Sequence, residues 1–103
     1  MERSVEQENK MREKDIEQAL VARVKAMGGI APKFTSPGFD GMPDRLALLP
    51  GGRVGFVELK APGKKPRALQ MARHRLLRRL GFKVYVIDEI NQIDSVLEEI
   101  DHE

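Results

Sequence analysis

The chain has no cysteine and no tryptophan, and its only histidines are His74 and His102. Without cysteine, a disulfide framework, a thiolate zinc site and a cysteine nucleophile are all excluded. His74 lies between Arg73 and Arg75, where we expect an exposed helix histidine, and His102 lies next to the end of the chain. Neither histidine supports a zinc site or a serine triad.

Long apolar runs are missing as well. No stretch reaches the length of a membrane span, and charged residues recur through the first seventeen positions, which argues against a secretory signal. We therefore expect a soluble, cytoplasmic protein with no membrane partner. With 103 residues, 41% of them hydrophobic and 33% charged, the chain can form one small domain with a modest core. We expect residues 1–10 to be flexible and residues 11–103 to form that domain.

Charge is distributed unevenly, although the formal net charge is only +2. Residues 60–83 contain nine basic residues and no acidic one, whereas residues 88–103 contain seven acidic residues and no lysine or arginine. A basic block is the usual footprint of a protein that binds phosphate backbones, because neutralised phosphates release condensed counterions. A solvated helix face is the alternative. Since no acid within the block can pair with its bases, we expect a nucleic acid partner.

Apolar periodicity and turn residues predict an αβββαβα order of elements. The predicted strands are 30–34, 44–49, 53–60 and 83–87. The predicted helices are 11–27, one opened by Lys64-Lys65-Pro66 and ended by Gly81, and a last one capped by Asn91. The fold class is α/β, with a four-stranded mixed sheet flanked by helices. Strands 53–60 and 83–87 should be parallel, because a helix connects them.

The predicted hairpin brings two carboxylates and one amine together. Glu58 and Lys60 point to the same face of their strand, since side chains alternate. Asp44 should lie across from Glu58, because each is seven residues from Gly51 in the turn. Converging carboxylates are the hard oxygen ligands that Mg²⁺ prefers, with Mn²⁺ as a substitute, and a nearby lysine can orient a water. A cross-strand salt bridge is the alternative.

Pro43-Asp44 followed by Glu58-Leu59-Lys60 resembles the PD-(D/E)XK nuclease signature. The strings KFTSPG (33–38), GMPDR (41–45) and VELKAPG (57–63) resemble its VRR-NUC branch, the virus-type replication-repair nucleases. The resemblance covers about residues 13–88 and implies a restriction-endonuclease-like αβββαβ core, with the C-terminal helix as an extra element. It also implies a metal-dependent DNA endonuclease. Members of this length often occur in phage or prophage genomes.

On this resemblance we expect Asp44 and Glu58 to bind the metal together with the backbone carbonyl of Leu59, and Lys60 to orient the attacking water. A glutamine on the helix after the ExK strand reaches the site in the family, and Gln70 occupies the corresponding position. An ordinary surface glutamine is the alternative for Gln70.

The first helix offers one more acid. Glu17 lies at the border of the apolar stripe and precedes Leu20-Val21 by three residues, as the acid of the family does, so we prefer it to Glu13 as a metal contact. Basic and polar residues near the motifs are candidates for DNA contact. They are Lys33, Ser36, Lys64, Lys65, Arg67 and Arg73.

The sequence says less about the substrate than about the reaction. A domain of this size has no second module that could recognise a base sequence, so recognition of DNA shape or of a branch is favoured. Single-domain members of the family look like structure-specific endonucleases, including Holliday-junction resolvases that act as homodimers, since two symmetric cuts need two sites. The alternatives are a non-specific or nicking nuclease, a non-catalytic DNA-binding module of the same fold, and a small protein-interaction module.

Overall fold

The structure is a computed structural model that describes residues 12–102. The segment 1–10, predicted to be flexible, lies outside the described residues. In chain order the described elements are α2 (Glu13–Ala26), β1 (Arg45–Leu49), β2 (Arg53–Leu59), α3 (Ala68–Arg79), β3 (Lys83–Ile87), the 3-10 helix η1 (Ile90–Gln92) and α4 (Ile93–Asp101). None of the helices in this part of the chain is long and apolar enough to cross a membrane.

The sheet has the order β1-β2-β3, with β2 in the centre. β1 pairs with β2 in antiparallel fashion, with Arg45 opposite Val57, and this confirms the predicted hairpin. β3 pairs with β2 in parallel, with Glu58 opposite Val86. The parallel pairing was expected, because α3 lies between the two strands in the chain and returns it to the same end of the sheet.

The predicted strand at 30–34 is wrong as a fourth strand, and the described sheet is three-stranded. This segment runs along β1 through isolated bridges instead. The N–H of Ile30 donates to the carbonyl of Leu48 at 3.0 Å, and the N–H of Phe34 donates to the carbonyl of Asp44 at 2.7 Å. Pro32 lies between these contacts and has no N–H to donate, so a regular ladder cannot continue through it.

The helix after β2 begins later than predicted. α3 begins at Ala68 and not at Lys64, so Pro66 precedes the helix instead of lying in its first turn. Arg67 is the N-cap residue, and its backbone N–H donates to Oε1 of Gln70 at 2.8 Å. Because the side chain of the third helical residue closes this contact, the helix begins where Gln70 can reach back.

The last helix is present in the structure as α4, but Asn91 does not cap it. Asn91 lies inside η1, and Gln92 is the N-cap residue of α4. The Oε1 atom of Gln92 accepts a hydrogen bond from the N–H of Asp88 at 2.9 Å. A glutamine therefore orders the turn between β3 and α4.

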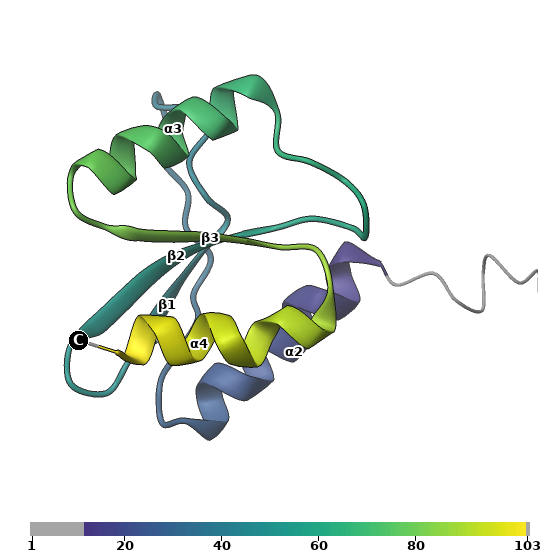
Figure 1. The fold of residues 1–103 in the computed structure, drawn as a ribbon, viewed down its shortest axis with the longest axis vertical. Coiled ribbons are helices and arrows are strands. Elements are labelled where there is room, and N and C mark those ends of the chain that lie inside the picture. The colour runs from purple at the N-terminus through teal and green to yellow at the C-terminus, as the bar shows by residue number, and fades with distance from the viewer. Residues whose placement is uncertain (1–11, 103) are drawn as a thin grey trace, which may run out of the picture.

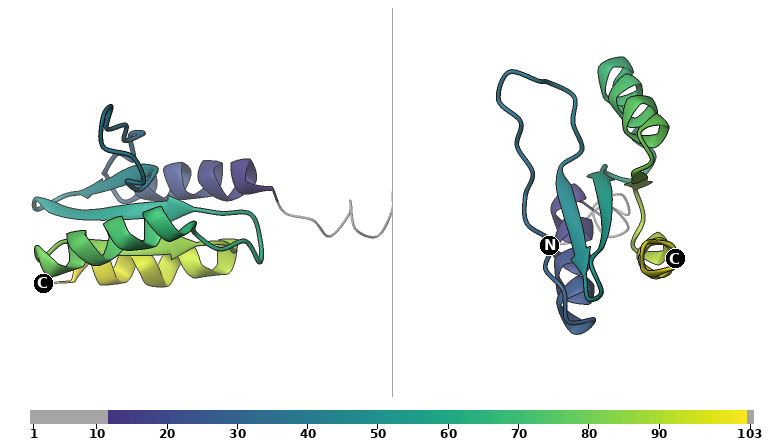
Figure 2. Two further views of the ribbon diagram at one scale, coloured as in Figure 1. Left: turned by 90° about the horizontal axis from the view of Figure 1, so that it is seen from above. Right: turned by 90° about the vertical axis from the view of Figure 1, so that its left-hand side faces the viewer.

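The two faces of the sheet differ in chemistry. Helices α2 and α4 cover one face and α3 covers the other (Figures 1 and 2). The apolar core lies on the side of α2 and α4, and its members include Ile16, Leu20, Val24, Leu59, Ile87, Ile93 and Ile100. Under α3, by contrast, the polar side chains of Glu58, Gln70 and His74 are buried. Buried polar groups must find partners, so the polar cluster under α3 marks this second face as the place of a candidate site.

Candidate active site

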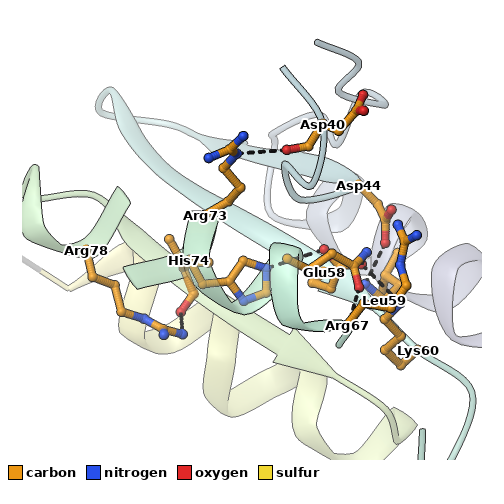
Figure 3. Close-up of polar contacts among 11 residues, drawn as sticks. Asp40, Asp44, Glu58, Leu59, Lys60, Arg67, Arg73, His74 and Arg78 are labelled. Carbon is orange, nitrogen blue, oxygen red and sulfur yellow. Dashed lines mark hydrogen bonds and ion pairs between the residues drawn. The ribbon is translucent and has the colours of Figure 1, made fainter. Parts of the chain in front are cut away.

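Asp44 and Glu58 meet at the open end of the hairpin. Asp44 immediately precedes β1, and the pairing of Arg45 with Val57 continues to place it opposite Glu58. The Oδ2 atom of Asp44 accepts a hydrogen bond from the N–H of Leu59 at 2.9 Å. This bond holds the Asp44 carboxylate beside the end of β2, and the two acids lie close together (Figure 3).

Lys60 lies on the same side as Glu58, as strand alternation predicts. Its Nζ atom is 3.5 Å from Oε2 of Glu58, and its side chain is largely buried. The structure therefore brings two carboxylates and one amine to a single position on the α3 side of the sheet. The ion pair of Lys60 joins it to Glu58, two residues earlier in the chain, and not across the hairpin.

Gln70 of α3 also contacts Glu58. Its Nε2 atom donates to Oε2 of Glu58 at 2.9 Å, while its Oε1 atom accepts from the backbone of Arg67. An amide side chain is suited to this position because it carries a donor and an acceptor at once. The same residue therefore caps α3 and fixes the orientation of the Glu58 carboxylate.

His74 belongs to this cluster, although we expected it to be exposed. Only 2% of its surface is accessible, and its Nε2 atom lies 3.4 Å from Oε1 of Glu58. Burial, followed by the positive charge of Arg78, lowers the pKa of His74, which favours a neutral ring that can donate from Nε2. The signal that could have found it is its position four residues after Gln70, on the same face of α3.

The surroundings of Glu58 disfavour its charged form. Burial, and then the neighbouring Asp44 carboxylate, raise the pKa of Glu58 to about 7, against the opposing effect of Lys60. A divalent cation stabilises a buried carboxylate that lies beside a second acid. No cluster of three or more histidine or acidic side chains suited to a metal exists among residues 12–102. Two carboxylates nevertheless fit Mg²⁺, which takes one or two of them and completes its shell with waters and phosphate oxygens.

Glu17 is not brought to the two carboxylates. Its Oε2 atom accepts from Nε of Arg45 at 2.9 Å. Arg45 and Asp44 are neighbours in the chain, so their side chains face opposite sides of the sheet. Glu17 therefore lies on the α2 side, away from Glu58, and Glu13 is exposed at the first position of α2. The predicted metal contact of Glu17 is therefore not supported, because its carboxylate pairs with Arg45 instead.

The candidate DNA-binding residues are distributed over three places. Lys64, Lys65 and Arg67 are exposed in the segment that joins β2 to α3, next to the carboxylate pair in the chain. Ser36 lies in the loop before Asp44, and Arg73 of α3 donates to the backbone of that loop. Lys33 lines a surface pocket of about 420 Å³ with Glu17 and Arg45, on the α2 side. Their contacts with DNA remain predictions.

A mixed sheet in which an acid before one strand meets an E-x-K segment at the end of the next defines a nuclease domain of the PD-(D/E)XK class. No protein-family model matches the sequence. The chain is 49% identical over 87 residues to "Putative nuclease p44" of Acyrthosiphon pisum secondary endosymbiont phage 1, an alignment that covers 84% of this chain and 92% of that protein. A solved structure described as "VRR_NUC domain" superimposes with a TM-score of 0.78 and 33% identity, over 84% of this chain and 94% of that one. The chain belongs to the VRR-NUC family, as its motifs predicted.

Proposed function

We propose that the chain is a metal-dependent endonuclease that hydrolyses phosphodiester bonds in DNA at the cluster of Asp44, Glu58 and Lys60. The observation that carries the proposal is the convergence of two carboxylates, one with its pKa raised to about 7, beside an amine 3.5 Å away. The similarity to a phage protein named as a nuclease supports the reaction class.

Each residue of the cluster has a distinct role in this proposal. Asp44 and Glu58, together with the backbone carbonyl of Leu59, hold Mg²⁺ or Mn²⁺. A divalent ion bound there supplies charge neutralisation at the phosphate and a lower pKa for water. Lys60 orients the attacking water and stabilises the negative charge that develops on the phosphate oxygens. Gln70 and His74 fix the rotamer of Glu58, so they act as positioning residues.

Single substitutions test these roles. Asp44→Ala, Glu58→Ala and Lys60→Ala should each reduce Mg²⁺-dependent cleavage by about 10²- to 10⁴-fold, the range typical for loss of a catalytic or electrostatic group. Glu98→Ala, which removes an exposed acid of α4, is the matched control and should cleave as the wild type does. Circular dichroism and a DNA mobility shift should show that the three variants still fold and bind. Cleavage retained in all three would rule the assignment out.

We further propose that the substrate is branched DNA and that the active species is a homodimer. The chain carries one such cluster in its described part, and two symmetric cuts at a junction need two. Cleavage of a four-way junction, a linear duplex and a single strand should be compared with Mg²⁺, with Mn²⁺ and with EDTA, alongside native mass spectrometry with DNA. Equal rates on all substrates would indicate a non-specific or nicking nuclease, and binding without cleavage would indicate a DNA-binding module.

A further inference from the structure

The loop at residues 35–43 carries an exposed aromatic ring beside the site. It projects from the sheet on the side that carries α3 and leads directly into Asp44 (Figure 2). Phe39 lies in this loop and 41% of its surface is exposed. An isolated exposed apolar side chain is common on proteins, so the exposure of Phe39 does not by itself indicate a binding site. The contacts around its ring are more specific.

The ring of Phe39 is held in place. Cζ of Arg73 lies over the ring, 3.9 Å from its centroid. Nε of the same arginine donates to the backbone carbonyl of Asp40 at 2.8 Å, as Figure 3 shows. The N–H of Phe39 also donates to the carbonyl of Ser36 at 3.0 Å, which closes a turn. One face of the ring is therefore covered by the guanidinium group of Arg73, while the residue as a whole stays 41% exposed.

The loop is also fixed against α3. Gly41 has a φ of +89°, and a Cβ atom at this position would lie 2.9 Å from Cγ of Leu69 and 3.2 Å from its carbonyl oxygen. Only glycine permits such a close approach to the helix. Because α3 also carries Gln70, which binds Glu58, the position of Phe39 is coupled to that of the carboxylates through one rigid helix.

The surroundings of the ring select a flat, uncharged ligand. The exposed carboxylate of Asp40 next to Phe39 disfavours a phosphate at the ring itself. Leu69, also exposed, adds apolar surface one turn from Arg73. Basic side chains that suit a phosphate backbone begin at the N-terminus of α3, with Arg67 and Lys65. Among the parts of DNA, a nucleobase is the group that can stack on the ring. The phosphates that flank this nucleobase can then contact the basic side chains.

We infer that Phe39 is a stacking platform for an unpaired nucleobase close to the scissile phosphate, with Arg73 holding the opposite face of the ring. This inference rests on the proposed DNA substrate and deepens it. A base inside a continuous duplex is already stacked on both sides, whereas a base at a junction, a flap or a gap can be turned out onto the ring. Phe39 therefore selects DNA with unstacked bases, and the binding energy of the stack contributes to that selection.

The inference can be tested in EDTA, where no cleavage is needed. A gapped duplex carrying 2-aminopurine at the unpaired position and a four-way junction carrying it at the branch point serve as probes, with a fully paired linear duplex as reference. Wild-type protein should quench the fluorescence of the unpaired probe. Phe39→Ala should abolish the quenching and weaken binding to unpaired DNA by about 10- to 100-fold, with little change for the duplex.

Matched variants separate stacking from other effects. Phe39→Tyr should retain quenching and affinity, and Phe39→Leu should lose both, because leucine is apolar but has no π face. Phe82→Ala removes another exposed phenylalanine, 50% accessible, that precedes β3 away from the site, and it should behave as the wild type. Thermal unfolding should show that the Phe39 variants keep their fold, since the side chain lies in a loop.

The outcomes distinguish this inference from the proposed function. If Phe39→Leu quenches and binds as the wild type does, or if wild-type protein gives no quenching at any unpaired position, stacking by Phe39 is overturned even when cleavage is observed. If wild-type protein never cleaves with Mg²⁺ or Mn²⁺ but quenches in a Phe39-dependent way, the nuclease assignment fails and the stacking site stands.

Discussion

Glu58 is a fully buried acid surrounded by donors on one side and by another acid on the other. Gln70 and His74 approach its two oxygens from α3, and Lys60 approaches from its own strand. Asp44 supplies the opposing charge. Removing a carboxylate from water costs several kcal/mol unless the donors compensate for it, so the energetics of this residue depend on pH.

The raised pKa of Glu58 predicts a specific dependence of stability on pH. Because its pKa is raised to about 7, Glu58 keeps its proton in the folded protein up to about that pH, whereas the unfolded chain releases it near the ordinary pKa of 4.5. The contribution of the protonated Glu58 to the free energy of unfolding is therefore fully present below about pH 4.5 and is lost as the pH rises through about 7. In Glu58→Gln this group no longer titrates. We expect the free energy of unfolding of the variant, relative to wild type, to increase by up to about 3 kcal/mol between pH 4 and pH 8 in EDTA.

Urea unfolding at a series of pH values measures this difference. Glu98→Gln, at an exposed position of α4, is the control and should give a curve parallel to that of the wild type. Added Mg²⁺ should stabilise the wild type more than Glu58→Gln, since only the wild type keeps both carboxylates. A Glu58→Gln curve parallel to that of the wild type in EDTA would show that this carboxyl does not titrate abnormally.

The amide of Gln70 can be tested by a change of one atom. Gln70→Glu keeps the acceptor for the Arg67 N–H but replaces the donor to Glu58 with a third negative charge. We expect a loss of cleavage of about 10- to 100-fold and a lower melting temperature at pH 8, because like charges repel. Gln92→Glu is a matched control, since Gln92 also accepts from a backbone N–H and donates to a carboxylate, that of Asp88. Equal activity losses in both variants would refute a specific role for Gln70.

At the scale of elements, β2 and α4 pack through a glycine. A Cβ atom at Gly55 would lie 2.5 Å from Cδ1 and 2.6 Å from Cγ1 of Ile100, which is buried. Gly55→Ala should therefore destabilise the protein by about 1–3 kcal/mol through overpacking. In the double variant with Ile100→Ala the cost should be clearly less than the sum of the single costs, because the two residues share one space. The pair Gly55→Ala and Leu77→Ala, on opposite faces of the sheet, should be additive in urea unfolding.

The elements that sequence predicted well are those with local determinants. The turn at Gly51 and the alternation of Glu58 and Lys60 set the hairpin register, so the meeting of Asp44 with Glu58 followed from the chain alone. The start of α3 and the failure of the strand at 30–34 depend on Gln70 and on a single proline, which periodicity does not weigh. Burial of His74 and the pairing of Glu17 with Arg45 depend on which face of the sheet each helix covers, and that is a tertiary fact.

At the scale of the whole molecule, the sheet separates a basic region from an acidic one. The segment before α3 and α3 itself are basic, whereas α4 on the other side of the sheet is acidic (Figure 1). Several lysine and arginine side chains between β2 and the start of β3 already form hydrogen bonds or ion pairs within the protein. They are Lys60 with Glu58, Arg73 with Asp40, Arg78 with Val84 and Lys83 with the carbonyls at the end of α4. The exposed lysines 64 and 65 are therefore the better candidates for phosphate contact, and DNA should approach from the α3 side.

Salt dependence tests this direction of approach. Each lysine that contacts a phosphate contributes about one to the magnitude of the negative slope of log K against log salt concentration. Lys64→Gln together with Lys65→Gln should therefore reduce this magnitude by about two and weaken binding to all DNA substrates alike. Glu89→Gln together with Glu98→Gln changes the net charge by the same amount, in the opposite sense, at exposed positions after β3. Because charges beyond about 10 Å are screened at 0.1 M salt, this second pair should leave the slope unchanged. If the two pairs changed the slope equally, net charge alone would govern binding, and the basic surface before α3 would not be the DNA interface.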